Sequence, residues 1–229
     1  RFVRLGLFVA AMLFSITGFT AANVESVTGD VRSGTTATNG TQIRVGQRLL
    51  EGAVVVSGPR AQAILRFDDG QAILLHENTE FKITTYSFIR NDASRDSFVC
   101  DLLKGALRSV SAARTSRRPN AYVSRTPDAT IGIRGTDYMV SIINPLEMAV
   151  LQGVVSAAGT VGAPLSVAAG QFAAFTSGLP GALVGAGSLS STSLAAFGQM
   201  GSVSIGAAGT AATTGTGTGT GAGTGTGTG

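Results

Sequence analysis

The residues whose types could take part in catalysis or binding are one arginine in an apolar setting, the only histidine, the only cysteine and two adjacent aspartates. Arg134 stands in the segment TPDATIGIRGTDYMV, between two apolar, β-branched stretches. A buried guanidinium is costly unless carboxylates or carbonyls hold its five N–H donors. Arg134 therefore either binds a ligand or forms a structural pair, and because buried arginines are normally paired we favour the structural pair.

The apolar positions around Arg134 change parity. They are odd-numbered before the Arg-Gly-Thr triplet and even-numbered after it: Ile131 and Ile133, then Tyr138, Val140 and Ile142. Side chains alternate strictly along a strand, so one extra residue must be inserted near the triplet. Gly135 is best able to take the unusual φ, which predicts a bulge or corner between two strands, completed by Arg134 and Thr136.

Two further features complete the proposed structural motif. Thr126-Pro127 fixes an extended entry and marks a turn or an edge of the sheet. The partner of the Arg134 guanidinium is expected among carbonyls and acidic side chains. The nearest candidate in sequence is Asp137, and the remote ones are Asp69, Glu77, Glu80 and Asp101.

The other reactive residue types do not form a catalytic or metal-binding set. His76 is the only histidine, and no Gly-x-Ser-x-Gly nucleophile motif accompanies it. One His and one Cys are too few for a zinc site. Asp68-Asp69 is explained by the chemistry of a hairpin turn, and Cys100 alternates with apolar neighbours, which predicts a small buried residue. We expect no enzyme activity, no metal and no cofactor.

A basic cluster remains as a candidate interaction patch. Arg114, Arg117 and Arg118 lie in the segment ARTSRRPN. The cluster is either a solvated loop, which we favour, or a patch that contacts anionic envelope polymers or a partner protein. The chain carries 17 Lys+Arg, 13 Asp+Glu and a formal charge of +4.

The N-terminal segment predicts export. Arg1 and Arg4 precede an apolar run over residues 5–19, and small residues follow at positions 20–22. This order is typical of a secretory signal peptide over residues 1–22, cleaved after Ala22, and the run is short for an uncleaved membrane anchor. Cleavage would leave a mature chain that is only mildly basic. We therefore expect an exported protein that binds no nucleic acid and keeps no transmembrane span.

The elements that must position these residues are short strands. Over residues 23–177 short apolar stretches alternate with glycine-containing turns, and no window shows a convincing helical period. The clearest hairpin is AQAILRFDDGQAILL, with Asp68-Asp69-Gly70 as its turn. The sequence predicts an all-β domain of about ten or more short strands, arranged as a sandwich or an irregular β-helix.

A five-residue pattern recurs in this region: apolar, polar, Gly, any residue, apolar. It occurs around Gly29, Gly105 and Gly153. A glycine at its centre allows a bulge or sharp bend between two strand halves. The unequal intervals between the copies argue against a fixed-period solenoid and favour strands that bend repeatedly.

The C-terminal part changes in composition. Residues 178–210 are rich in Gly, Ala and Ser, with a weak helix prediction over residues 190–200 in which Leu194, Phe197 and Met200 share a face. Residues 211–229 are a Gly-Thr repeat without large apolar side chains, and we expect a disordered tail there.

The region predicted to be all-β resembles the FecR domain family. The resemblance runs in order over about residues 24–177, and the Thr-Pro to Arg-Gly-Thr block is its most specific part. The matching segments are Gly29-Asp30-Val31, Phe67-Asp68-Asp69-Gly70-Gln71, residues 102–107 (LLKGAL), Thr126-Pro127-Asp128-Ala129, residues 133–140 (IRGTDYMV) and Ala169-Gly170-Gln171.

The resemblance implies an exported β-domain in the periplasm or cell envelope. The family's best-known members relay a signal from an outer-membrane receptor to a cytoplasmic sigma factor. Few residues precede the apolar run here, so we do not expect the cytoplasmic sigma-binding region. The leading hypothesis is a non-catalytic module that binds another envelope protein or a ligand. The alternatives are a structural surface or matrix protein and a domain that binds cell-wall polysaccharide.

Overall fold

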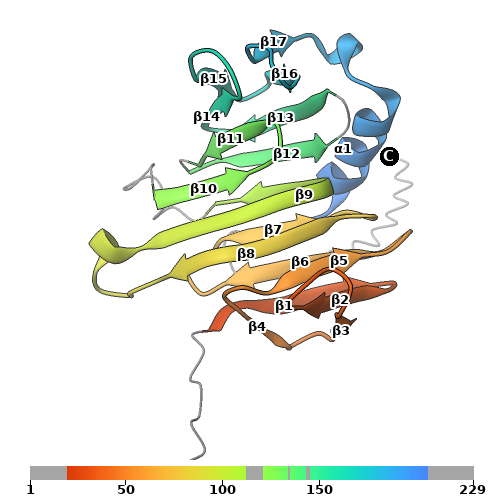
Figure 1. Cartoon of the computed structure of the whole chain (residues 1–229), viewed down its shortest axis with the longest axis vertical. Coiled ribbons are helices and arrows are strands. Elements are labelled where there is room, and N and C mark those ends of the chain that lie inside the picture. The colour runs from red at the N-terminus through yellow and green to blue at the C-terminus, as the bar shows by residue number, and fades with distance from the viewer. Residues whose placement is uncertain (1–19, 112–120, 134, 143–144, 206–229) are drawn as a thin grey trace, which may run out of the picture.

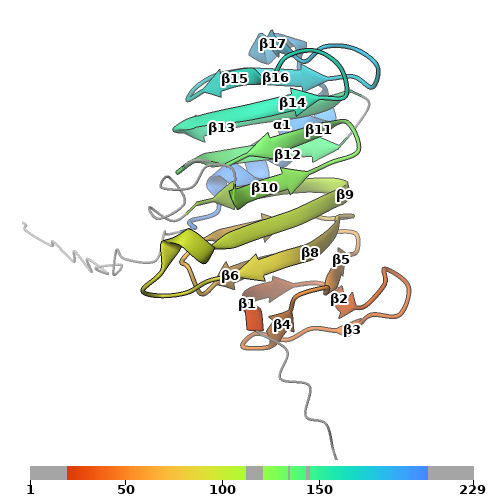
Figure 2. The ribbon, with the colours of Figure 1, turned by 60° about the vertical axis from the view of Figure 1, so that its left-hand side comes forward.

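Two β-sheets stacked face to face form the body of the molecule. The computed structural model describes residues 20–111, 121–133, 135–142 and 145–205, and these contain 17 strands. The strands run across the long axis of the molecule and succeed one another along it (Figures 1 and 2). The prediction of an all-β fold with ten or more short strands is confirmed.

Sheet A is antiparallel throughout. Its strands, in order across the sheet, are β4 (Arg48–Leu50), β1 (Thr20–Thr28), β6 (Gln62–Phe67), β7 (Ala72–Leu75), the second half of β9 (Ser97–Val110), β12 (Asp137–Ile142), β13 (Leu146–Gln152), β16 (Phe172–Phe175) and β17 (Ala182–Val184).

Sheet B contains one parallel pair, β9 with β10. Its order is β3 (Thr41–Gln42), β2 (Val31–Gly34), β5 (Val54–Ser57), β8 (Glu80–Ser87), the first half of β9, β10 (Tyr122–Arg125), β11 (Ala129–Gly132), β14 (Val154–Gly159) and β15 (Leu165–Ala168). Only β9 belongs to both sheets among the described residues.

The chain passes repeatedly from one sheet to the other, and a residue with positive φ stands at each of these corners that falls within the described residues. The corner residues are Gly29, Gly46, Gly52, Arg60, Asn78, Gly105, Gly135, Gly153 and Gly170. The recurring pattern found in the sequence therefore marks sheet-to-sheet corners. Strand β9 shows this directly, because it pairs with β8 before Gly105 and with β12 from Gly105 onward.

The main core fills the space between the sheets. Phe67, Tyr86, Phe98 and Tyr122 form a connected aromatic group, with ring centroids 4.9 Å apart for the closest pair, Phe67 and Phe98. The predicted hairpin is confirmed as β6 and β7, and Cys100 is buried in the same core as predicted. Burial raises the pKa of the Cys100 thiol to about 12.

A second apolar cluster lies on the outer face of sheet A, under the helix α1 (Ser191–Ser202). The helix contributes Ala196, Phe197 and Met200, and the sheet contributes Ala72, Leu74, Ala106, Met139 and Ala149. The predicted helix is confirmed, but one residue of its predicted face is wrong. Leu194 is 44% exposed, whereas Ser193 is buried with Phe197 and Met200.

The described strands extend slightly beyond the predicted β-domain. Strand β1 already begins at Thr20, and Ala21 and Ala22 are fully buried in it. Cleavage after Ala22 remains a prediction, which N-terminal sequencing of exported protein would measure. No helix in the described part of the chain is long and apolar enough to cross a membrane. The predicted C-terminal tail, residues 211–229, lies outside the described residues.

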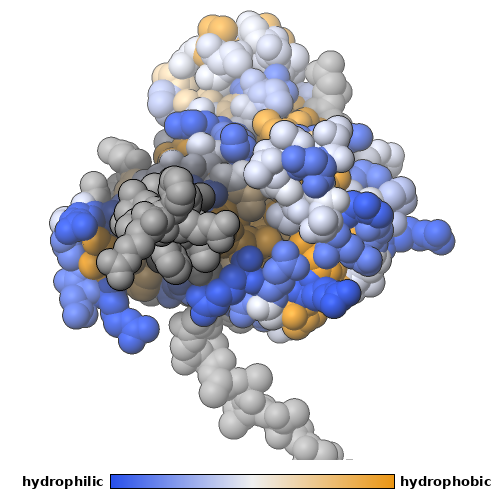
Figure 3. All heavy atoms as spheres, turned by 60° about the horizontal axis from the view of Figure 1, so that its bottom comes forward, coloured by the Kyte–Doolittle hydropathy of each residue, from blue (hydrophilic) through white to orange (hydrophobic). Residues whose placement is uncertain are grey.

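The end of the sandwich near β2, β3 and β4 carries mostly polar side chains with small apolar areas between them (Figure 3). Val45 and Leu50 are among its exposed apolar residues, at 63% and 46%. Helix α1 lies away from this end, beside the middle and upper strands of sheet A (Figure 1).

Candidate binding site

The motif singled out in the sequence is divided between a hairpin turn and a sheet-to-sheet corner. Thr126 closes the turn between β10 and β11: its backbone N–H and its hydroxyl donate to the carbonyl of Ala129, and its Oγ1 accepts from the Ala129 N–H, each over 2.9 Å. Pro127 follows in the same turn. The Thr126-Pro127 pair thus shapes the backbone before β11.

Gly135 and Thr136 form the corner at which the chain leaves sheet B and enters sheet A. Gly135 has φ +62°, and the side chains on either side change parity, because Ile133 and Tyr138 both point into the main core. A Cβ added to Gly153 would lie 2.7 Å from the Gly135 carbonyl oxygen. Two corners therefore pack backbone against backbone at this point.

Arg134 and the basic cluster Arg114, Arg117 and Arg118 lie outside the described residues, so their roles stay predictions. The geometry does bear on the expected partner of Arg134. Both carboxylate oxygens of Asp137 accept hydrogen bonds from Arg108, over 2.9 and 2.7 Å. Asp137, the nearest candidate in sequence, is thus already engaged by another arginine.

Arg108 is the buried arginine that the sequence reasoning missed. It lies on the second half of β9, is 9% exposed, and also donates through Nη1 to the carbonyls of Met200 and Val203, each over 2.9 Å. Its position within the apolar strand segment GALRSV was the available signal, but its carboxylate partner is 29 residues away. Arg108 holds the C-terminal end of α1 to sheet A.

Glu147 on β13 performs the matching task at the other end of α1. Its carboxylate accepts from the Ser190 backbone N–H over 3.0 and 3.1 Å and from the Ser190 hydroxyl over 2.9 Å. Ser190 is the N-cap of α1, and its Oγ accepts from the Ser193 N–H. A carboxylate near the N-terminus and a guanidinium near the C-terminus both suit the helix dipole.

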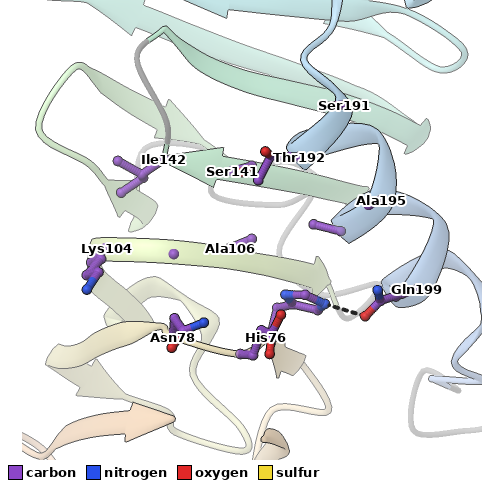
Figure 4. Close-up of a pocket in the computed structure, with 13 residues that line it drawn as sticks. His76, Asn78, Lys104, Ala106, Ser141, Ile142, Ser191, Thr192, Ala195 and Gln199 are labelled. Atoms are coloured by element: carbon purple, nitrogen blue, oxygen red, sulfur yellow. Dashed lines mark hydrogen bonds between the residues drawn. The ribbon is translucent and has the colours of Figure 1, made fainter. Parts of the chain in front are cut away.

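Between these two attachments, a cleft of about 500 Å³ opens under the first half of α1 (Figure 4). The helix side carries Ser191, Thr192, Ala195, Ala196 and Gln199. The sheet side is formed by the corner residues after β7, by β9 near Gly105 and by the end of β12. Its residues are His76, Glu77, Asn78, Lys104, Gly105, Ala106, Ser141 and Ile142.

His76 connects the two sides of this cleft. Its Nε2 lies 2.8 Å from the Gln199 side-chain oxygen, as the dashed line in Figure 4 shows. A second hollow of about 270 Å³ lies beside the same bond and is lined by Arg60, Ala61, Gln62, His76, Glu77 and Gln199. The His76–Gln199 bond therefore crosses between two hollows beneath the helix.

The cleft has binding chemistry but no assembled catalytic group. Its lining combines apolar atoms from Ala106 and Ile142 with amide, hydroxyl, ammonium and carboxylate groups. His76 meets an amide there, and Cys100 is buried in the core. Among the described residues, no group of three or more His, Cys, Asp or Glu side chains could hold a metal ion. The arrangement is suited to contact with a ligand or another protein.

Comparison with protein-family models finds one match, which covers part of the chain. Residues 53–156 match the family model described as FecR protein, which confirms the resemblance over that segment. The matched segment runs from β5 into β14 and thus contains Arg108, Glu147 and the sheet side of the cleft, whereas α1 follows it.

Two crystal structures of a proposed anti-sigma factor from Parabacteroides distasonis, at 1.65 and 2.50 Å resolution, are similar to this chain. The TM-scores are 0.44 and 0.45, with 11% sequence identity. Each comparison covers 57% of this chain and 57% of the other, so the chain spans little more than half of that protein's length. A comparison with curated proteins finds no match.

Proposed function

We propose that this chain, which contains a FecR family domain, is a non-catalytic module of the bacterial cell envelope that binds another protein and relays a signal through that contact. The observation that carries the proposal is the FecR match over residues 53–156. The cleft supports it, because sheet side and helix side together offer a mixed apolar and polar contact surface next to a separately attached helix.

The proposed location is the periplasm or the exterior of a Gram-negative-type bacterium. The basic start, the apolar run and the small residues at positions 20–22 support export. Cys100 fits this compartment, because a single buried cysteine leaves no exposed thiol for unwanted pairing.

Cell fractionation combined with cross-linking tests the proposal. We expect the protein in the soluble envelope fraction, cross-linked to one specific envelope protein whose recovery depends on the intact domain. Recovery in surface-attached assemblies without such a partner would favour the structural surface protein instead. Co-sedimentation with purified cell wall would favour polysaccharide binding, and a consistent failure to capture any specific protein would contradict the signal-relay module.

A further inference from the structure

We propose that the outer face of sheet A is a docking surface for an amphipathic helix of the partner protein, and that α1 occupies this surface reversibly in the free protein. The proposal rests on the proposed function, since it names the surface through which the module contacts its partner. The expected occupant is a partner helix that lies on the sheet with the same N-to-C direction as α1.

Helix α1 has little tendency to form without its contacts to the sheet. Its sequence, STSLAAFGQMGS, contains two glycines and four serines or threonines and has no charged residue. These are weak helix formers, and a helix of this length is marginal in water by itself. A segment of this kind detaches by local unfolding at a free energy below that of the whole domain.

The packing of α1 against sheet A is also incomplete. Ala196, Phe197 and Met200 pack on the sheet, but the first half of the helix stands over the cleft of about 500 Å³. Within the described part of the chain, the buried Ser193 hydroxyl has no hydrogen-bond partner. The helix is therefore fastened at its two ends, along one short apolar stripe and by the single His76–Gln199 hydrogen bond.

The surface that α1 covers has the features of a helix-binding site. Its apolar floor consists of Ala72, Leu74, Ala106, Met139 and Ala149, all at most 4% exposed while α1 is in place. Small side chains in the floor allow close approach of a helix backbone. An apolar area of this kind, when uncovered, marks an interaction surface.

Charges at both ends of the floor define the polarity of the occupant. Glu147 lies where the N-terminus of the bound helix lies, and Arg108 lies where its last carbonyls lie. This charge complementarity fits a partner helix that begins with a Ser or Thr N-cap, carries an aromatic and a Met-like residue on one face, and ends with free carbonyls over Arg108. Asp137, the carboxylate partner of Arg108, belongs to β12 and not to the helix, so this pair does not depend on α1 for either of its members.

A peptide that copies α1 is the probe for this surface. A fluorescently labelled peptide of residues 186–205 would be titrated against the full chain and four variants of it. Ser190→Ala removes the N-cap hydroxyl and its bond to Glu147, while the backbone N–H bonds to Glu147 stay, and the lost cap loosens the resident helix. Gly198→Ala and Gly201→Ala, separately and together, tighten it, because no atom lies within 4 Å of either new Cβ and alanine favours a helix.

We expect the peptide to bind Ser190→Ala about five-fold more tightly than the wild type, because apparent affinity rises with the fraction of free surface. Binding to the Gly198→Ala/Gly201→Ala double variant should weaken at least ten-fold relative to wild type. A peptide with the same residues in reversed order, whose N-cap and apolar face are misplaced, is the polarity control and should bind no variant.

Hydrogen exchange of the full chain supplies the second readout. The α1 amides should exchange faster than those of β7, β9 and β12, faster still in Ser190→Ala and more slowly in the double variant. Equal exchange rates in α1 and these strands would overturn the proposal. A peptide affinity that is the same for the wild type and all variants would overturn it too. A concentration-dependent dimer that exchanges α1 between copies would assign the surface to a second copy and also overturn it.

Neither readout requires the natural partner. Failure of the peptide and exchange tests would remove this docking surface while leaving the envelope-binding module intact. Failure to find an envelope partner, with peptide binding as expected, would reject the proposed function and keep the surface.

Discussion

Gly105 explains at the level of one residue why the corners of this fold favour glycine. Its φ is +85°, and a Cβ there would lie 2.6 Å from the Thr79 Cα and 2.7 Å from the Asn78 carbonyl oxygen. Both neighbours are backbone atoms of the adjacent corner, so they cannot move aside as the end of a flexible side chain would. The position combines a conformational constraint with a steric one.

We therefore expect Gly105→Ala to lower the free energy of unfolding by about 2–4 kcal/mol, measured by urea denaturation. Gly52→Ala is the matched control, since Gly52 has φ +86° and no atom within 4 Å of the added Cβ. This control should cost only about 1 kcal/mol from the strained φ. Equal losses in both variants would contradict the close packing of corners.

Asp69 provides a test through pH. It lies in the β6–β7 turn, its Oδ1 accepts from the Gln71 N–H over 2.9 Å, and burial raises its pKa above the ordinary value of 3.8. A raised pKa means that the folded state disfavours the ionised carboxylate. The resulting destabilisation is absent at low pH, where the group is protonated in both states, and develops as pH rises past 3.8.

We expect Asp69→Asn to gain stability relative to the wild type as pH increases from about 3 to about 7, because the amide keeps the turn acceptor without the charge. Urea denaturation of both proteins across this range measures the difference. A difference that stays constant with pH, or that moves in the opposite direction, would show that Asp69 is not the group responsible.

At the scale of elements, we expect the contacts in the sandwich core to stabilise the whole fold and the contacts of α1 to stabilise only the attachment of the helix. Phe98 belongs to the aromatic group between the sheets, whereas Phe197 packs only on the outer face of sheet A. We expect Phe98→Ala to lower the free energy of global unfolding by about 3–5 kcal/mol. Phe197→Ala should instead release α1 and leave the unfolding of the sandwich nearly unchanged.

Hydrogen exchange and urea denaturation of the two variants separate these effects. Phe197→Ala should accelerate exchange in α1 while the β6–β7 and β9–β12 ladders keep their protection. A loss of global stability in Phe197→Ala as large as that in Phe98→Ala would mean that helix and sandwich unfold as one unit.

Local patterns in the sequence were sufficient to predict many of the strands and the helix, but they were insufficient to predict the contacts between residues far apart in the chain. Alternation located the β6–β7 hairpin, and the parity change located the corner at Gly135. The Arg108–Asp137 and Glu147–Ser190 contacts join residues 29 and 43 positions apart, and no local period contains that information. The face of α1 was partly wrong for the same reason, because tertiary contacts decide which side of a helix meets the sheet: Ser193 is buried, whereas Leu194 is exposed.

At the scale of the whole molecule, the fold separates a rigid part from an attached part. The two sheets share one core and are tied together by β9 and by the corners. Helix α1 follows the FecR match and is fastened to the sandwich through its two ends, one apolar stripe and the His76–Gln199 hydrogen bond. Such an arrangement suits signal relay, because a partner can change the position of the attached part without unfolding the rigid one.

The central claim, that the module works by binding an envelope protein at this face, is tested most directly by photocross-linking in intact cells. A photoreactive amino acid would replace Lys104 at the cleft or, as the control, Thr38 in the exposed loop between β2 and β3. We expect one discrete adduct with an envelope protein from the Lys104 position and none from the Thr38 position. The same adducts from both positions, no discrete adduct from Lys104, or an adduct with a cytoplasmic protein would contradict the account.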